Sequence, residues 1–97
     1  MKQLEGSIAW VTGAGSGIGE AVAIRLAALG ATVVLSGRRK EPLESVARRI
    51  AAAGGTAWTR PGDLSRAATA DRIVAAIERR FGRLDIVVNN AGLNVLE

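Results

Sequence analysis

Hydrophobic residues along the chain follow two spacings in turn, which is the pattern of strands alternating with helices. Short apolar runs rich in β-branched residues predict the strands. The run at 31–36 is continuous rather than alternating, as expected of a parallel strand that is covered on both faces. The predicted strands cover residues 7–12, 31–36, 56–59 and 84–88.

Between these runs, apolar residues recur every three or four positions, which predicts amphipathic helices. Pro42 suits the first turn of the second helix, and Ser65 is placed to cap the third. Gly30, Gly54 and Gly82 stand where the helices should end. The predicted inner faces are Ile18, Val22, Leu26 and Leu29 in the first helix, Leu43, Val46, Ile50 and Ala53 in the second, and Ile73, Val74, Ile77 and Phe81 in the third.

Successive strands are separated by stretches long enough to hold a helix, so they should pair in parallel through right-handed crossovers. The predicted class is α/β, a parallel sheet flanked by helices. A helix should cover the strand at 84–88, yet the sequence ends at Glu97. We therefore expect residues 1–97 to be the front part of a longer protein, truncated after the fourth strand, with apolar surface that self-associates.

The composition restricts the chemistry that the chain can perform. Hydrophobic residues make up 48% and charged residues 23%, as in a folded, core-forming chain. Cys, His and Tyr are absent, which excludes thiol catalysis, disulfides and zinc fingers, and no metal site is predicted. Without a long uncharged run or a signal-peptide pattern, the sequence predicts a cytoplasmic protein with no membrane partner.

The net charge of +4 raises the question of nucleic acid, because clustered arginines neutralise phosphates. Most of the arginines, however, are spread along predicted helices and are interleaved with acidic residues. That distribution is typical of solvated helix faces. We expect no nucleic-acid partner.

A glycine-rich turn joins the first predicted strand to the first predicted helix over residues 12–19. Backbone N–H groups and the positive end of the helix point at whatever occupies such a turn, so phosphate is the natural ligand. Gly13, Gly17 and Gly19 form neither G-x-G-x-x-G nor a P-loop, since Ile18 stands where the last glycine of the former would be. The alternative is a plain left-handed turn whose small residues serve helix packing.

The end of the second predicted strand bears on which dinucleotide would bind. An acidic residue there would hydrogen-bond a ribose 2′-OH, whereas a nearby arginine would accommodate a 2′-phosphate. The chain reads Ser-Gly-Arg-Arg-Lys over residues 36–40, so Arg38 offers a planar fork and no carboxylate is present. This pattern predicts NADP rather than NAD, unless these cations only solvate a loop.

The chain closely resembles the classical branch of the short-chain dehydrogenase/reductase (SDR) family. Thr-Gly-x-x-x-Gly-x-Gly at 12–19 is similar to the cofactor turn of that family, and Asn-Asn-Ala-Gly at 89–92 is similar to a second motif after its fourth strand. The resemblance covers the whole chain. It implies a Rossmann-like sheet of order 3-2-1-4, with residues 1–97 as a partial NAD(P)-binding domain.

The resemblance also assigns site residues. Gly13, Ser16 and Ile18 would line the pyrophosphate and the nicotinamide side, together with the motif residues Gly17 and Gly19. In the same way, Asp63 and Leu64 would meet the adenine ring, and Asn90, Ala91 and Gly92 would flank the adenosine ribose. At the position of Ser16, many NADP-preferring members carry a basic residue, so this chain departs from their pattern.

The implied activity is hydride transfer between NADP(H) and a small carbonyl or alcohol substrate by an oxidoreductase that forms homo-oligomers. The catalytic Ser and the Tyr-x-x-x-Lys pair of the family are missing, so these residues alone should be inactive and no catalytic residue is assigned. The alternative, from another functional class, is a noncatalytic nucleotide-binding module or a truncated relic.

Overall fold

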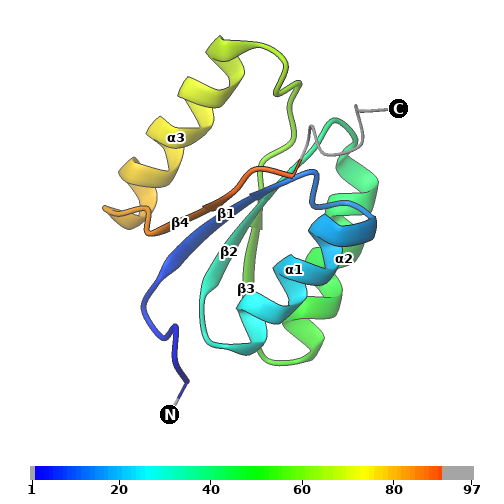
Figure 1. The fold of residues 1–97 in the computed structure, drawn as a ribbon, viewed down its shortest axis with the longest axis vertical. Helices are drawn as coiled ribbons and strands as arrows, with labels where there is room; N and C mark the ends of the chain where they lie inside the picture. The colour runs from blue at the N-terminus through cyan, green and yellow to red at the C-terminus, as the bar shows by residue number, and fades with distance from the viewer. Residues whose placement is uncertain (1, 91–97) are drawn as a thin grey trace.

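Strands and helices alternate along the chain in the computed structural model, which describes residues 2–90. Each strand is short, and each helix between two strands is long enough to cross one face of the sheet (Figure 1). The elements are β1 (Ile8–Thr12), α1 (Gly17–Ala28), β2 (Thr32–Ser36), α2 (Lys40–Ala52), β3 (Thr56–Thr59), α3 (Ala67–Phe81) and β4 (Ile86–Val88).

The strands form one parallel sheet of order β3-β2-β1-β4, which confirms the predicted order 3-2-1-4. The register places Trp10 of β1 between Val34 of β2 and Val87 of β4. Helices α1 and α2 lie on one face of the sheet and α3 lies on the other (Figure 1). The fold is therefore the α/β arrangement that the alternation predicted, with the Rossmann-like strand order that the resemblance implied.

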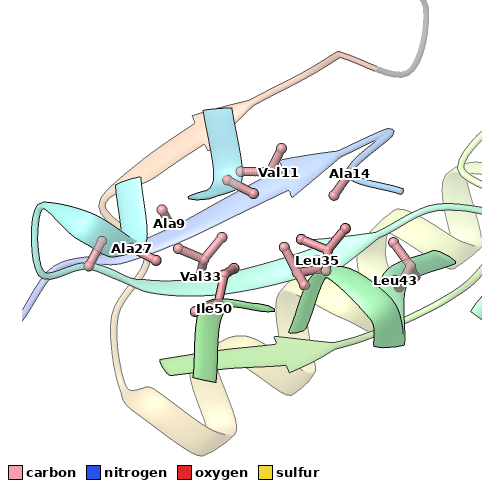
Figure 2. Close-up of a cluster of buried hydrophobic side chains, with 11 residues drawn as sticks. Ala9, Val11, Ala14, Ala27, Val33, Leu35, Leu43 and Ile50 are labelled. Atoms are coloured by element: carbon pink, nitrogen blue, oxygen red, sulfur yellow. The ribbon is translucent and has the colours of Figure 1, made fainter. Parts of the chain in front are cut away.

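Two apolar clusters hold the three layers together. The larger joins β1 and β2 to α1 and α2, and Figure 2 shows Val33 and Leu35 of β2 among the side chains of that cluster. The smaller joins Trp10 and Val34 to Ile73 and Ile77 of α3. Because alternate residues of a strand point to opposite faces, β1 contributes to both clusters, and all of its residues are buried.

The predicted inner face of α1 is wrong by about one position. Ile18 is 66% exposed, and the buried residues of this helix are Gly19, Ala23 and Ala27. These small residues let the helix backbone lie close to the sheet, and the larger Val22, Leu26 and Leu29 flank that contact half-buried. A glycine-alanine face gives almost no hydrophobic periodicity, so the sequence pattern selected the larger neighbours instead.

Two further predictions about helix ends are corrected by the structure. Ser65 does not cap α3, because the helix begins two residues later, after Arg66. The Ser65 hydroxyl donates instead to Oδ1 of Asp63 at 2.7 Å. Ala53 is exposed because α2 ends at Ala52. By contrast, the predicted inner face of α3 is confirmed, with Ile73 and Ile77 buried and Val74 and Phe81 packed beside them.

The ends of the sheet strands differ slightly from the prediction. β2 begins at Thr32 rather than at residue 31, and β4 begins at Ile86 rather than at residue 84. Ahead of β4, Asp85 accepts a hydrogen bond from the Ile8 backbone N–H at 2.8 Å and holds the start of β1 through its side chain. None of the helices between residues 2 and 90 has both the length and the apolar character needed to cross a membrane.

Candidate functional site

The loops that follow β1, β2 and β3 are joined to one another at the carboxyl edge of the sheet. The N–H of Ala14 donates to the carbonyl of Ser36 at 3.0 Å, and the N–H of Gly62 donates to the carbonyl of Gly37 at 2.9 Å. In open α/β sheets, this edge is where ligands bind, beside the point at which the strand order reverses. Here the reversal lies between β1 and β4.

A pocket of about 190 Å³ opens between the turn after β1 and the turn after β2. It is smaller than the roughly 300–1,000 Å³ of pockets that enclose a whole drug-sized ligand, so it suits one end of a dinucleotide. No carboxylate lines this pocket. The lining residues are Gly13, Gly15, Ser16, Gly37, Arg38, Arg39, Pro42 and Leu43.

At two of its glycines, the turn on one wall has no room for a side chain. A Cβ on Gly19 would overlap the carbonyl oxygen of Gly13, and a Cβ on Gly15 would lie 2.9 Å from the Cβ of Pro42. Gly13 and Gly17 also adopt positive φ, at 62° and 59°, where a side chain is strained. The turn therefore leaves its backbone open to a close-lying ligand, as a pyrophosphate requires.

Helix α1 presents its N-terminus to the same turn. Ser16 precedes the helix in an extended conformation, and its exposed hydroxyl makes no capping hydrogen bond. The first N–H groups of a helix have no partner within it, and the helix dipole favours an anion at this end. Hydroxyl and backbone donors thus converge where a phosphate would lie, so the residues present fit the diphosphate of a dinucleotide.

The opposite wall carries positive charge. Arg38 and Arg39 are both exposed beside the pocket, and Nε of Arg38 lies 3.8 Å from Oδ1 of Asp63. The side chain of Arg38 is 76% exposed, so solvent screens this ion pair and leaves it weak. An incoming phosphate would meet a guanidinium that the protein holds only loosely.

Asp63 is held more firmly by its own loop than by Arg38. Both the hydroxyl and the N–H of Ser65 donate to Oδ1 of Asp63, at 2.7 and 3.0 Å. The pKa of Asp63 is lowered mainly by these hydrogen bonds and further by the charges of Arg38 and Arg66. Asp63 is therefore an ionised hydrogen-bond acceptor at the edge of the site at neutral pH.

The segment after β4 is tied to the glycine turn by two residues. The N–H of Asn90 donates to the hydroxyl oxygen of Thr12 at 2.9 Å, and the Asn90 side-chain amide donates to the carbonyl of Gly13 at 3.2 Å. The Thr12 hydroxyl lies 3.1 Å from Oδ1 of Asn89, to which it can donate. These contacts set the spacing between β4 and the turn.

The structure brings some of the predicted site residues together and separates others. Gly13, Ser16 and Arg38 line one pocket, Asp63 reaches Arg38, and Asn90 binds the glycine turn. Leu64 instead packs half-buried against the α3-side cluster. Of the remaining predicted residues, Gly17 and Gly19 shape the turn, Ile18 is exposed beside it, and Ala91 and Gly92 lie outside the described residues.

Several residues of the pocket were not among those predicted from the sequence. Gly15 lies within the glycine turn, and Arg39 is adjacent to Arg38, so their positions in the sequence could have indicated them. Pro42 and Leu43 come from the first turn of α2, and only the packing of that helix against the turn after β1 brings them to the pocket.

Residues 7–97 match the family described as short chain dehydrogenase. The chain belongs to the short-chain dehydrogenase family. It is 46% identical over 92 residues to the 2,3-dihydro-2,3-dihydroxybenzoate dehydrogenase of Bacillus subtilis, an alignment that covers 95% of this chain and 35% of that protein.

Solved structures share the fold as well. A metagenomic short-chain oxidoreductase in complex with NADP superposes with a TM-score of 0.89 at 46% identity, over 92% of this chain and 40% of the other. A 3-oxoacyl (acyl-carrier-protein) reductase from Agrobacterium tumefaciens with NADP bound gives a TM-score of 0.83 at 42% identity, over 91% of this chain and 34% of the other. The chain therefore spans well under half the length of these relatives.

Proposed function

We propose that this chain is the NADP(H)-binding part of an oxidoreductase that transfers hydride between the cofactor and a small carbonyl or alcohol substrate. The observation that carries the proposal is the pairing of two pocket walls, with the glycine turn and Ser16 on one side and Arg38 and Arg39 on the other. No carboxylate stands among the lining residues to receive a ribose 2′-OH. Two solved relatives that contain NADP add support.

Each wall has a separate role in this proposal. The backbone of the turn and the N-terminus of α1 hold the pyrophosphate, while Arg38 offers a fork of N–H donors to the 2′-phosphate. Asp63 accepts from the adenine side, and Asn90 keeps the glycine turn at its distance from β4. The nicotinamide of the bound cofactor supplies the hydride chemistry.

The proposal assigns proton transfer and substrate binding to residues outside this sequence. The chain contains no Tyr, His or Cys that could act as an acid or base near neutral pH, so residues 1–97 should bind cofactor without turnover. The natural protein would be a longer, cytoplasmic homo-oligomer. The same lack of catalytic groups favours a second candidate, a noncatalytic nucleotide-binding module, which would bind NADPH equally well but reduce no carbonyl even in its natural form.

Arg38→Ala tests the cofactor assignment when NADPH and NADH binding are both measured by calorimetry. Loss of a charge-assisted hydrogen bond of about 1.5–3 kcal/mol should weaken NADPH binding by about tenfold or more and change NADH binding by less than about twofold. Arg48→Ala, an exposed change on α2 away from the pocket lining, is the matched control. An equal loss for both cofactors would refute the 2′-phosphate assignment.

A further inference from the structure

A second cationic site lies on the α3 side of β3, away from the pocket lining. Trp58 lies in β3, and Arg60 directly follows that strand with its N–H donating to the Leu35 carbonyl of β2 at 2.8 Å. The guanidinium carbon of Arg60 lies 3.4 Å from the centre of the Trp58 ring. Arg80 of α3 approaches the same ring at 4.9 Å, and Phe81 meets it edge-on at 5.4 Å. We call Trp58, Arg60, Arg80 and Phe81 the arginine–indole cluster.

Neither arginine of the cluster has a carboxylate partner among residues 2–90, a property that they share with other exposed arginines such as Arg25, Arg39 and Arg48. Arg38, Arg49, Arg66 and Arg83 each form an ion pair, whereas neither Arg60 nor Arg80 pairs with any acidic residue between residues 2 and 90. Burial lowers the pKa of Arg60, and the neighbouring charge of Arg80 lowers it further. The cluster therefore gathers two cationic side chains that form no ion pair with a described carboxylate.

A third arginine extends the cluster along α3. Nη2 of Arg72 lies 3.8 Å from the position that a Cβ on Gly62 would occupy, in the loop that follows β3. Arg72 and Arg80 are separated by about 12 Å along the helix, at 1.5 Å per residue. Like the two arginines of the cluster, Arg72 forms no ion pair within the part of the chain that the structure describes. Together with the cluster, Arg72 adds a third positive charge to the surface on the α3 side.

We propose that this surface docks an acidic segment of a partner protein. A guanidinium stacked on an aromatic ring still presents its N–H edge outward and can grip a carboxylate with two hydrogen bonds. One donor of Arg60, Nη1, is held by the carbonyl of Thr59 at 3.0 Å, which fixes the plane of the group before any partner arrives. Fixing the side chain in advance lowers the entropy lost on binding.

The geometry favours carboxylates over nucleic acid as the ligand. Single-stranded nucleic acid binds where bases stack on free aromatic faces beside basic residues. In the cluster, Arg60 covers a face of the Trp58 indole at stacking distance, and the ring is also packed half-buried against the α3-side cluster of the core. The indole therefore holds the guanidinium in place and offers no open face to a base.

The test measures how the purified protein binds a dye-labelled octaglutamate peptide, by fluorescence anisotropy at low ionic strength. Arg60→Gln/Arg80→Gln should raise the Kd by about tenfold or more. The control Arg25→Gln/Arg48→Gln removes the same charge from exposed positions on α1 and α2, on the other face of the sheet, and should change the Kd by less than about twofold. NADPH affinity should be unchanged in both variants, which separates this proposal from the proposed function.

Circular dichroism shows whether each variant is folded. If the Arg60→Gln/Arg80→Gln variant unfolds, the single change Arg80→Gln at an exposed position takes its place. Equal weakening in the cluster variant and the control would overturn the proposal, since net charge alone would then explain binding. Failure of the native protein to bind octaglutamate would overturn it as well. Tighter binding of octathymidylate than of octaglutamate, lost in the cluster variant, would assign the surface to nucleic acid instead.

Discussion

Gly19 of α1 lies against the carbonyl group of Gly13, with no room between them for even a methyl group. A Cβ on Gly19 would overlap the Gly13 oxygen and stand 2.7 Å from the side-chain nitrogen of Asn90. Gly13 belongs to the turn and Asn90 to the segment after β4. Because the Asn90 amide donates to the Gly13 carbonyl, neither residue can shift without moving the other. This contact makes the glycine turn a packed structure before any ligand binds.

Gly19→Ala should therefore destabilise the protein by about 3 kcal/mol or more, since the added methyl meets backbone rather than a flexible side chain. Urea unfolding measures the change. Gly17→Ala is the matched control, because φ is +59° there but nothing lies within 4 Å of the new Cβ. It should cost only the left-handed backbone penalty of about 1–2 kcal/mol. Equal costs for the two changes would show that the Gly13 contact is unimportant.

Asn90→Asp should destabilise the protein by about 1–3 kcal/mol at neutral pH, because a carboxylate would replace the amide that donates to the Gly13 carbonyl. Thermal or urea unfolding gives the difference. Asn89→Asp makes the same chemical change one residue earlier but keeps the oxygen that accepts from Thr12. That control should stay within about 0.5 kcal/mol of the native protein, and a larger loss there would contradict the assignment.

Ser36→Ala should cost about 1–3 kcal/mol, because the indole Nε1 of buried Trp10 donates to Ser36 Oγ at 2.8 Å and would lose its acceptor. A double-mutant cycle with Trp10→Phe should show that the two single losses do not add. Ser45→Ala, a half-buried serine of α2 with no side-chain hydrogen bond in the described structure, should leave stability unchanged or slightly higher. Additive losses in the cycle would exclude a direct Trp10–Ser36 interaction.

Acid should weaken the fold partly through Asp85. The pKa of Asp85 lies below its ordinary value of 3.8, first because Arg83 donates to the carboxylate and then because the Ile8 N–H does. A carboxyl group whose pKa is lower in the folded state adds stability above its unfolded pKa and loses it as pH falls through the folded value. The urea concentration at the midpoint of unfolding should therefore fall as the pH is lowered below about 4.

Asp85→Asn should lower stability at neutral pH and flatten this acid dependence, as followed by urea midpoints at several pH values. Asp71→Asn removes an exposed carboxylate of α3 that makes no ion pair within residues 2–90. This second variant should keep the acid loss of the native protein. If Asp85→Asn leaves the acid dependence of stability unchanged, other titratable groups are responsible for that dependence.

Local signals predicted most of the fold. The third strand matches its prediction at 56–59, because glycine precedes it and an Arg-Pro-Gly segment follows it. Gly30, Gly54 and Gly82 follow the ends of the helices with positive φ, as their positions predicted. Ser65 failed as a cap because α3 begins two residues later, after Arg66, and the Ser65 hydroxyl donates instead to Asp63.

The candidate site likewise contains residues that local sequence signals predicted and contacts that they did not. Gly13 and Arg38 follow from short motifs at strand ends, although their roles toward a cofactor remain predictions. The position of Pro42 over Gly15, by contrast, depends on how α2 packs, and no local pattern encodes that contact. The hydrogen bond from Asn90 to Gly13 joins residues 77 apart and likewise depends on the tertiary structure.

The burial of β1 on both faces gives the two walls of the pocket unequal freedom to change during evolution. The glycine turn continues from a strand whose residues all lie in the interior and closes against Asn90, so substitutions there disturb the whole sheet. Arg38 and Arg39 stand exposed on the other wall, and surface substitutions of this kind cost little stability. If the proposed function holds, selection can alter which dinucleotide the fold accepts by changing the loop after β2, while the glycine turn stays as it is.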